Sequence, residues 1–398
     1  MARFDAFRGI RYDLDTVRID DVVAPPYDVV TPRRRAELAA KSAFSVVHID
    51  QPDATRGDVA YDEAAATFRE WRQRGVLVTD ANPSMYIYRM DYRGDANRST
   101  RTVGVIGALE VTGANEGAVL PHEHTTPKAT TDRLSLIRAT QANLSPIWGL
   151  SPSTGLTALL ETSEPPAAEW LASDGARHRL WPVDDPALLA RITQSVARAP
   201  VLIADGHHRF EVSLQYRRER REANGDRPGA YDRVMALVVE LSEDELSVLP
   251  IHRLIAGLPP QFSLTDALSG CFTLTRLTLD PSTIAAHMAA TATLTLITPD
   301  GAWSMKPRPE AMSGVRDLDS SRLDRALETF PAHALTFQHG VDHVLAAVRD
   351  GRAQAGVLLR PVPLAQIEAI AHGGERMPPK STFFNPKPST GAVFMSVE

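Results

Sequence analysis

The chain has 398 residues, of which 43% are hydrophobic and 23% charged; this balance is typical of a soluble globular protein with two or three domains. Its net charge of −6 and its pI near 6.1 exclude a general attraction to nucleic acid or to anionic membranes. The single cysteine, Cys271, excludes an internal disulfide framework and thiolate-rich zinc sites. The charged N-terminus predicts no secretory signal, and no stretch approaches the roughly 20 apolar residues of a membrane span. We therefore expect a cytoplasmic protein.

The first 150 residues predict helices and strands from the spacing of their apolar residues. After a turn-rich start at 24–32, these elements are a helix at 59–74, strands at 85–92 and 101–111, and a helix at 134–143. The helix at 134–143 follows a polar stretch at 120–133. Residues 150–185 are rich in Ser, Pro and acidic groups, and they predict surface loops with one short helix.

The remaining chain continues this mixture. The predicted elements are a helix at 186–200, a strand at 201–204, a helix from 209, a helix or strand at 232–242, strands at 272–279, 292–298 and 354–360, and helices at 321–329 and 341–350. The tail from 375 contains many prolines and lysines, and it predicts an extended, docked segment. The fold class is therefore α+β with a mixed sheet. The expected domains are 1–100, 101–260, 261–374 and the tail, 375–398.

The segment VLIADGHHRFEVSL (201–214) contains the most informative cluster of polar residues. It reads as a buried strand, a turn at Asp205-Gly206 and a helix, so His207, His208 and Arg209 fall at a helix N-terminus. Backbone amides and the positive end of the helix dipole favour anions there. A guanidinium neutralises phosphate oxygens, and an imidazole can donate to a leaving oxygen. Asp205 could hold a metal or orient a histidine.

A second cluster is PHEHT (121–125). On a strand His122 and His124 share one face, and Glu123 points to the other. The two histidines could bind a transition metal if His207 or His208 supplied a third ligand. Alternatively, Glu123 or His124 could act as a general base. Lys128, Asp132 and Arg133 continue this polar stretch. They could contribute donors that bind an anion, or they could form a solvated helix face, and both interpretations stay open.

Two proline-containing segments add weaker signals. MPPKSTFFNPK (377–387) carries two phenylalanines, which predict that this segment is docked and that its lysines can reach the active site. Within it, Lys380, Ser381 and Thr382 are expected to bind the phosphate-bearing cofactor. APPYD (24–28) predicts a rigid turn that presents Tyr27 and Asp28. Asn143, Ser145, His252 and Arg253 are polar residues in apolar surroundings and are weaker candidates.

The motifs as a set resemble the DUF1015 family of uncharacterised bacterial and archaeal proteins. They are VAPPYDVV, WRQRGVLV, HEHTTPKATTDRL, NLSPIWGL, IADGHHRFE, LPIHRL and MPPKSTFFNPK. The element DGHHR is also similar to the phosphate-binding loop of the ParB/sulfiredoxin-like superfamily, which includes ADP-dependent free-serine kinases. This second resemblance implies a ParB/sulfiredoxin-like core in which Gly206, His207, His208 and Arg209 contact nucleotide phosphates with Mg²⁺ present, beside Asp205.

The standard dinucleotide, P-loop and α/β-hydrolase motifs are absent from the sequence. The combined expectation is a phosphotransferase that uses ATP or ADP with Mg²⁺ and acts on a small hydroxyl metabolite, with free serine or phosphoserine as the leading substrate. Asp205 and His122 would hold metal, Glu123 or Asp28 would take the hydroxyl proton, and Lys380 would add charge. The alternatives are a metal-dependent hydrolase using His122, His124 and His207, and a nucleotide-binding regulator. We expect no nucleic-acid or membrane partner, and a homodimer stays open.

Overall fold

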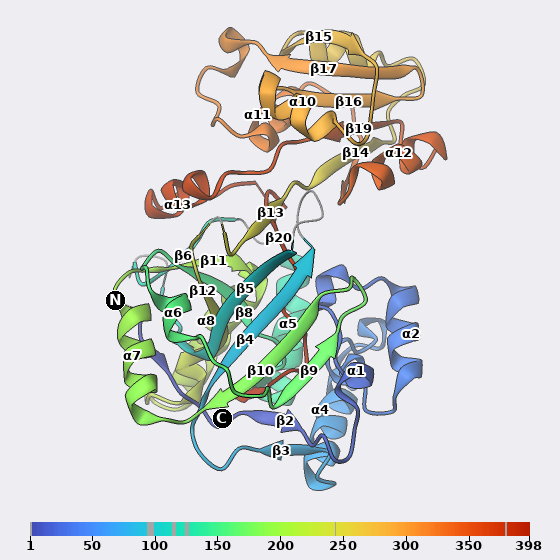
Figure 1. Cartoon of the computed structure of the whole chain (residues 1–398). Coiled ribbons are helices and arrows are strands. Elements are labelled where there is room, and N and C mark those ends of the chain that lie inside the picture. Colours follow the sequence, from blue (N-terminus) through green and yellow to red (C-terminus); the bar gives the residue numbers. More distant parts are fainter. Residues whose placement is uncertain (1, 94–98, 114–116, 124–126, 243, 379) are drawn as a thin grey trace. The chain divides into compact units, whose positions relative to one another are not determined.

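The computed structural model divides the chain into two compact units (Figure 1). It describes all residues except 1, 94–98, 114–116, 124–126, 243 and 379, and it leaves the side chains of 127–129 undescribed. Unit 1 consists of Met1–Ser247, Ala371–Glu375 and Phe384–Glu398, and unit 2 of Val248–Ile370 and Arg376–Phe383. In the described parts no helix has the length and apolar character needed to cross a bilayer. The domain limits expected from the sequence remain predictions.

Unit 1 is built on a nine-stranded mixed sheet. In spatial order its strands are β6 (Val119–Pro121), β11 (Val201–Asp205), β8 (Ile147–Ser151), β12 (Arg233–Glu240), β5 (Ser99–Glu110), β4 (Met85–Arg93), β10 (Arg177–Val183) and β9 (Ala168–Leu171), with β1 (Phe4–Asp5) beside β5. The pairs β6–β11 and β8–β12 are parallel, and the other pairs are antiparallel. The expected α+β class with a mixed sheet is confirmed.

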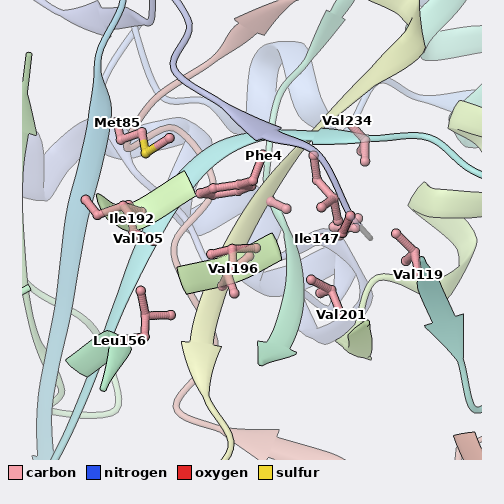
Figure 2. Packing of buried hydrophobic residues seen from close by; sticks show 14 of the residues in the cluster. Phe4, Met85, Val105, Val119, Ile147, Leu156, Ile192, Val196, Val201 and Val234 are labelled. Atoms are coloured by element: carbon pink, nitrogen blue, oxygen red, sulfur yellow. The ribbon is translucent and has the colours of Figure 1, made fainter. Parts of the chain in front are cut away.

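The helices of unit 1 pack on this sheet and on one another. They are α1 (Ile19–Val22), α2 (Pro32–Lys41), α3 (Val47–Asp50), α4 (Asp58–Gln73), α5 (Pro127–Thr140), α6 (Leu156–Leu159), α7 (Pro186–Ala197) and α8 (His207–Ala223). Helix α8 packs on β8 and β12, α5 packs on α8, and α4 packs on α5. Helix α7 packs on β1, and its Ile192 and Val196 join Phe4 and Val105 in the main core (Figure 2).

In 150–185 the structure contains the expected short helix, α6, but the sequence interpretation missed the strands β9 and β10, where it predicted surface loops. These two strands lie at one end of the sheet, and their side chains alternate between buried and solvent-facing positions. Arg177 and Arg179 both pair with Glu169 on the neighbouring strand, at 2.5 Å, while His178 and Leu180 are buried. A strand with one polar face carries too many charges to stand out as apolar. The helix expected from residue 134 begins at Pro127, and the ambiguous segment at 232–242 contains strand β12.

The end of the tail is extended and docked within unit 1, as the sequence predicts. Ala24 and Thr390 exchange backbone hydrogen bonds of 3.1 and 2.8 Å, and Ile10 and Phe394 do the same at 2.9 and 2.8 Å. Strand β21 (Met395–Ser396) pairs with β7 (Ala142–Asn143). Since the tail runs antiparallel to the segment around Ala24, residues just before Thr390 lie beside the APPYD turn.

A buried polar cluster also holds the tail. The Ser389 amide donates to the Tyr88 hydroxyl (2.9 Å), and the Trp170 indole N–H donates to Ser389 Oγ (3.0 Å). The same Tyr88 hydroxyl lies 2.9 Å from His178 Nδ1, and the His178 ring stacks on Trp170. Burial lowers the pKa of His178 to about 4, because an imidazolium is poorly solvated there. His178 is therefore neutral at physiological pH.

This burial predicts a pH-dependent stability. Unfolded histidine has a pKa near 6.5, so between pH 6.5 and 4 the unfolded chain binds a proton at residue 178 that the native chain does not. Stability therefore falls as pH decreases through this window, by up to about 1.4 kcal/mol per pH unit from this histidine. In His178→Gln the slope of unfolding free energy against pH should decrease by up to about one proton, as measured by denaturant unfolding at pH 7 and 5. Equal slopes for the two proteins would contradict the assignment.

Unit 2 is organised around a six-stranded antiparallel sheet. Its strands in order are β15 (Phe272–Leu277), β17 (Gly301–Pro307), β16 (Leu294–Thr298), β19 (Ala355–Leu358), β14 (His252–Ala256) and β18 (Ala334–Gln338). Its helices include α9 (Leu264–Ser269), α10 (Ile284–Thr291), α11 (Asp319–Leu327), α12 (Val341–Arg349) and α13 (Leu364–His372). The short strands β2 (Ile10–Tyr12) and β3 (Leu77–Thr79) pair with each other within unit 1, and β13 (Ser247–Leu249) and β20 (Phe383–Asn385) each cross a sequence boundary between the units. The strands β15, β16 and β19 and the helices α11 and α12 were predicted from the sequence.

Candidate functional site

The segment 201–214 forms the expected strand, turn and helix. Strand β11 ends at Asp205, Gly206 has φ +90°, and α8 begins at His207. Only glycine takes this φ without strain, and a Cβ here would lie 3.1 Å from the Arg209 side chain and from Ile147. The hydrogen-bond ladder of α8 begins with Phe210 N–H donating to Gly206 O (2.9 Å). The amides of the first turn therefore lie outside the ladder, at the positive end of a 17-residue helix.

Asp205 is the centre of a chain of ion pairs at this turn. Its Oδ2 accepts from Arg209 Nη2 at 2.6 Å, and its Oδ1 pairs with Lys387 Nζ. The same Nζ lies 3.1 Å from Asp28 Oδ2. The side chains of Lys387, Arg209 and Asp205 are 7, 11 and 15% exposed, so these charges interact in a largely desolvated place. We call Asp28, Lys387, Asp205 and Arg209 the ion-pair chain.

Lys387 is a site residue that the sequence interpretation did not single out. Lys387 of the tail contacts Asp205, and the expectation that tail lysines reach an active site remains a prediction. Burial acts to lower the pKa of Lys387, but the carboxylates of Asp205 and Asp28 outweigh it, and its pKa is raised. Lys387 is therefore a cation at neutral pH.

Arg209 joins this turn to the segment between β7 and β8. Its Nη1 donates to Ser145 Oγ at 3.0 Å and to the Pro146 carbonyl. Its Nε is buried and has no hydrogen-bond partner within the described part of the chain. Ser145, a weak candidate in the sequence, thus helps to fix the guanidinium.

The structure also brings His122 to this turn. Because β6 and β11 are parallel neighbours, their carboxyl ends meet at one edge of the sheet, where His122 follows β6 and His207 follows β11. His122 N–H donates to His207 Nε2 at 3.4 Å, and the two rings are edge to face with centroids 4.6 Å apart. Burial lowers the pKa of His122 to about 4, so it adds no charge at neutral pH. Glu123 is buried beside it, and His208 is half-buried in the first turn of α8.

Several other predicted site residues are not placed at the turn. His124 lies outside the described residues, and the side chain of Lys128, in the first turn of α5, is likewise undescribed. Lys380, Ser381 and Thr382 belong to unit 2. There Ser381 Oγ donates to Pro378 O (2.7 Å) and lies 3.2 Å from Ser320 Oγ. Their expected roles at the turn remain predictions.

The expected metal-binding role of Asp205 and His122 does not follow from this geometry. Both carboxylate oxygens of Asp205 face cations, Lys387 and Arg209. Within the described residues, no three His, Cys, Asp or Glu side chains form a group that could hold a metal ion. The arrangement fits an orienting role for Asp205, and metal binding remains a prediction.

A second group of buried charges adjoins the ion-pair chain. Arg133 of α5 donates to Asp50 O (2.7 Å) and lies 3.3 Å from Asp50 Oδ1. It also pairs with Asp132 at 2.7 Å, and its guanidinium lies 4.3 Å from the centre of the Tyr27 ring. Burial raises the pKa of Tyr27 to about 12, so the phenol is neutral. The predicted APPYD turn therefore contacts both groups, because Tyr27 packs against Arg133 and Asp28 pairs with Lys387.

Between Arg133 and Arg209 lies a cavity of about 50 Å³. Its polar lining residues are Asp50, Arg133, Asn143, Ser145, Arg209 and Ser213. Asp50, the last residue of α3, is 2% exposed, and its Oδ2 has no hydrogen-bond partner among the described residues. Burial raises the pKa of Asp50. The sequence interpretation missed Asp50; its only signal was one acid ending the apolar run SVVHID.

Comparison with solved structures gives likenesses at low identity. A conserved hypothetical protein from Pyrococcus furiosus is 11% identical with a TM-score of 0.39, over 73% of this chain and 93% of that one. A free serine kinase in complex with AMP is 12% identical with a TM-score of 0.41, over 74% and 91%. SbnI with a C-terminal truncation, from Staphylococcus aureus, is 13% identical with a TM-score of 0.39, over 72% and 85%. These likenesses assign no function to this chain.

The sequence comparisons are more decisive about the family. No curated protein matches the chain. The family described as "Protein of unknown function (DUF1015)" matches residues 4–326, which is most of the chain. The family expected from the sequence motifs is thereby confirmed: the chain belongs to the DUF1015 family.

Proposed function

We propose that the protein is a nucleotide-dependent phosphotransferase that acts on a small hydroxyl metabolite, with free serine or phosphoserine as the leading substrate. One observation carries this proposal. Asp205 anchors two cations, Arg209 and Lys387, directly before the N-terminus of α8. A helix N-terminus flanked by fixed cations is suited to a phosphate group. The similarity of DGHHR to a known phosphate-binding loop supports the same proposal.

Each part of the turn has a distinct task in this proposal. The first-turn amides of α8 bind phosphate oxygens, and Gly206 lets the chain approach them closely. Arg209 and Lys387 neutralise charge that develops during transfer. In the structure these two cations are paired with Asp205 and Asp28. A bound phosphate would therefore interact with cations that also contact these carboxylates. Phosphoryl transfer depends mainly on such positioning and charge neutralisation.

The nucleotide is ATP or ADP in this proposal, and Mg²⁺ would enter bound to its phosphates. The buried His122 is neutral, and it supports the position of His207 rather than supplying charge. Glu123 follows His122 directly in the sequence and is buried, so it stays a proposed proton acceptor. Asp28 is the other proposed acceptor, and its carboxylate lies 3.1 Å from Lys387 Nζ.

The experiment is a calorimetric titration of the full chain with ADP, ATP and adenosine, with and without Mg²⁺. We expect the phosphorylated ligands to bind and adenosine not to bind, and affinity to fall with rising salt because the contacts are charged. Phosphorus NMR then tests transfer to L-serine and other small alcohols. Absence of binding by either nucleotide would refute the proposal. Binding without transfer to any alcohol would favour the nucleotide-binding regulator instead.

A further inference from the structure

A second cavity, formed within unit 2, has the size of a site for a small molecule. Its volume is about 400 Å³, which lies in the range of about 300–1,000 Å³ that is usual for such sites. Its wall consists of α10, the segment that leads into α11, and the segment from the end of β19 to the first turn of α13. The apolar part of this wall is formed by Ala289, Leu318, Pro361, Val362 and Pro363.

Arg360 is the positive group of this cavity, and a buried carboxylate holds it in place. Asp319 Oδ1 accepts from Arg360 Nη2 at 2.6 Å, and Asp319 Oδ2 accepts from Arg360 Nε and from its backbone N–H, both at 2.9 Å. The Asp319 side chain is 5% exposed and that of Arg360 is 24% exposed. Arg360 Nη1 donates to no group within the described part of the chain and is not enclosed by it. This edge of a fixed guanidinium suits an anionic oxygen.

Asp317 lines the same cavity and is its accessible negative group. Its side chain is 82% exposed, and its Oδ1 pairs with Arg322 Nη2 at 2.5 Å. Its Oδ2 has no partner among the residues that the structure describes. Its backbone is fixed as well, because Gln366 Nε2 donates to the Asp317 carbonyl at 2.5 Å. The pKa of Arg360 is raised by its hydrogen bonds to Asp319 and also by the charge of Asp317, so Asp317 lies within electrostatic reach of the guanidinium.

The arrangement of these charges favours a ligand that carries both signs. Arg322 also lies 3.4 Å from Asp319, so the cluster of Asp317, Asp319, Arg322 and Arg360 is neutral as a whole. A ligand with only a negative charge would be attracted by Arg360 but repelled by the two aspartates, and a ligand with only a positive charge would be repelled by the two arginines. A zwitterion matches both ends of the cluster.

We propose that this cavity binds a free α-amino acid with an apolar side chain, with its carboxylate on Arg360, its ammonium on Asp317 and its side chain on the apolar wall. The two charged groups of an α-amino acid are attached to one carbon atom, so they can contact two neighbouring groups of the wall at once. The volume also leaves room for a large side chain, since about 150 Å³ accommodates benzene. The inference concerns unit 2 alone and does not depend on the proposed phosphotransferase function.

The experiment compares each amino acid with two analogues that lack one of its charges. L-leucine is compared with 3-methylbutylamine and 4-methylpentanoate, L-phenylalanine with 2-phenylethylamine and 3-phenylpropanoate, and L-alanine with ethylamine and propanoate. Binding to the full chain is measured by calorimetry. We expect at least one amino acid to bind about tenfold or more tightly than both of its analogues, because each analogue loses a hydrogen bond between charged groups.

Two variants assign the two ends of the ligand. In Asp317→Asn the preference for the amino acid over the carboxylate analogue should fall below about threefold, while the preference over the amine stays. In Arg360→Gln the reverse should hold. Asp317 is mostly exposed, so Asp317→Asn decides the question even if Arg360→Gln does not fold. Asp350→Asn is the matched control, because Asp350 is also paired with an arginine, Arg349 at 3.1 Å, but lies outside the cavity wall; it should retain both preferences.

A variant of unit 1 tests whether the amino acid binds elsewhere. Arg209→Ala, at the start of α8, should leave the affinity for the amino acid within about threefold of the wild type. The inference is overturned if no amino acid is preferred over its analogues, if Asp317→Asn keeps both preferences, or if Arg209→Ala rather than Asp317→Asn abolishes binding.

Discussion

Arg209→Ala is expected to weaken nucleotide binding by about 10- to 100-fold, since a hydrogen bond to a charged group contributes about 1.5–3 kcal/mol. The substitution removes a cation at the start of α8 and releases the three groups that hold it, Asp205, Ser145 and the Pro146 carbonyl. The free energy of unfolding should also fall by about 3 kcal/mol, because a largely buried ion pair loses one partner. Calorimetry with ADP and denaturant unfolding measure the two effects separately.

The matched control for this substitution is Arg217→Ala. Arg217 lies on the same helix, donates to Asp232 at 3.0 Å and to the Val111 carbonyl at 2.8 Å, and stands eight residues further from the N-terminus, about 12 Å along the axis. It should reduce stability without changing nucleotide affinity. Arg209→Lys should be intermediate, because an ammonium keeps the charge but not the fork of donors. Equal nucleotide affinities in Arg209→Ala and the wild type would remove Arg209 from the site.

The elements around the Asp205-Gly206 turn were predictable because their signals are local. An apolar run followed by Asp205-Gly206 and a periodic segment specifies a strand, a turn and a helix within about 20 residues, and β11 and α8 follow that pattern. The same reasoning predicted α4, β4 and β5. It failed for β9 and β10, where cross-strand ion pairs replace apolar residues on one face.

The composition of the site was less predictable because it depends on contacts between distant segments. Lys387 reaches Asp205 only because the tail pairs with the segment around Ala24, and one sequence does not reveal that register. Asp50 is recognisable as unusual only when its burial and its contact with Arg133 are known. Lys380 and Lys387 have similar sequence surroundings, yet they belong to different units.

Lys387→Met is expected to lower the free energy of unfolding by about 3 kcal/mol, because the methionine keeps the length of the side chain but leaves Asp28 and Asp205 without the cation they share. The exposed control Lys41→Met, whose nearest ion pair is 3.8 Å long, should change stability by less than about 1 kcal/mol.

A double-mutant cycle between Lys387 and Asp205 isolates their interaction from the other contacts of the tail. Asp205→Asn alone leaves Lys387 and Arg209 facing an uncharged partner, whereas combining it with Lys387→Met removes one of those two cations. The double variant should therefore be more stable than the sum of the single effects predicts, by about 1–3 kcal/mol. Strict additivity in denaturant unfolding would mean that the contact between Lys387 and Asp205 does not help to hold the tail. A large coupling energy would instead show that the docked tail and the Asp205-Gly206 turn form one electrostatic unit, so that a phosphate competing for Lys387 would also act on the tail.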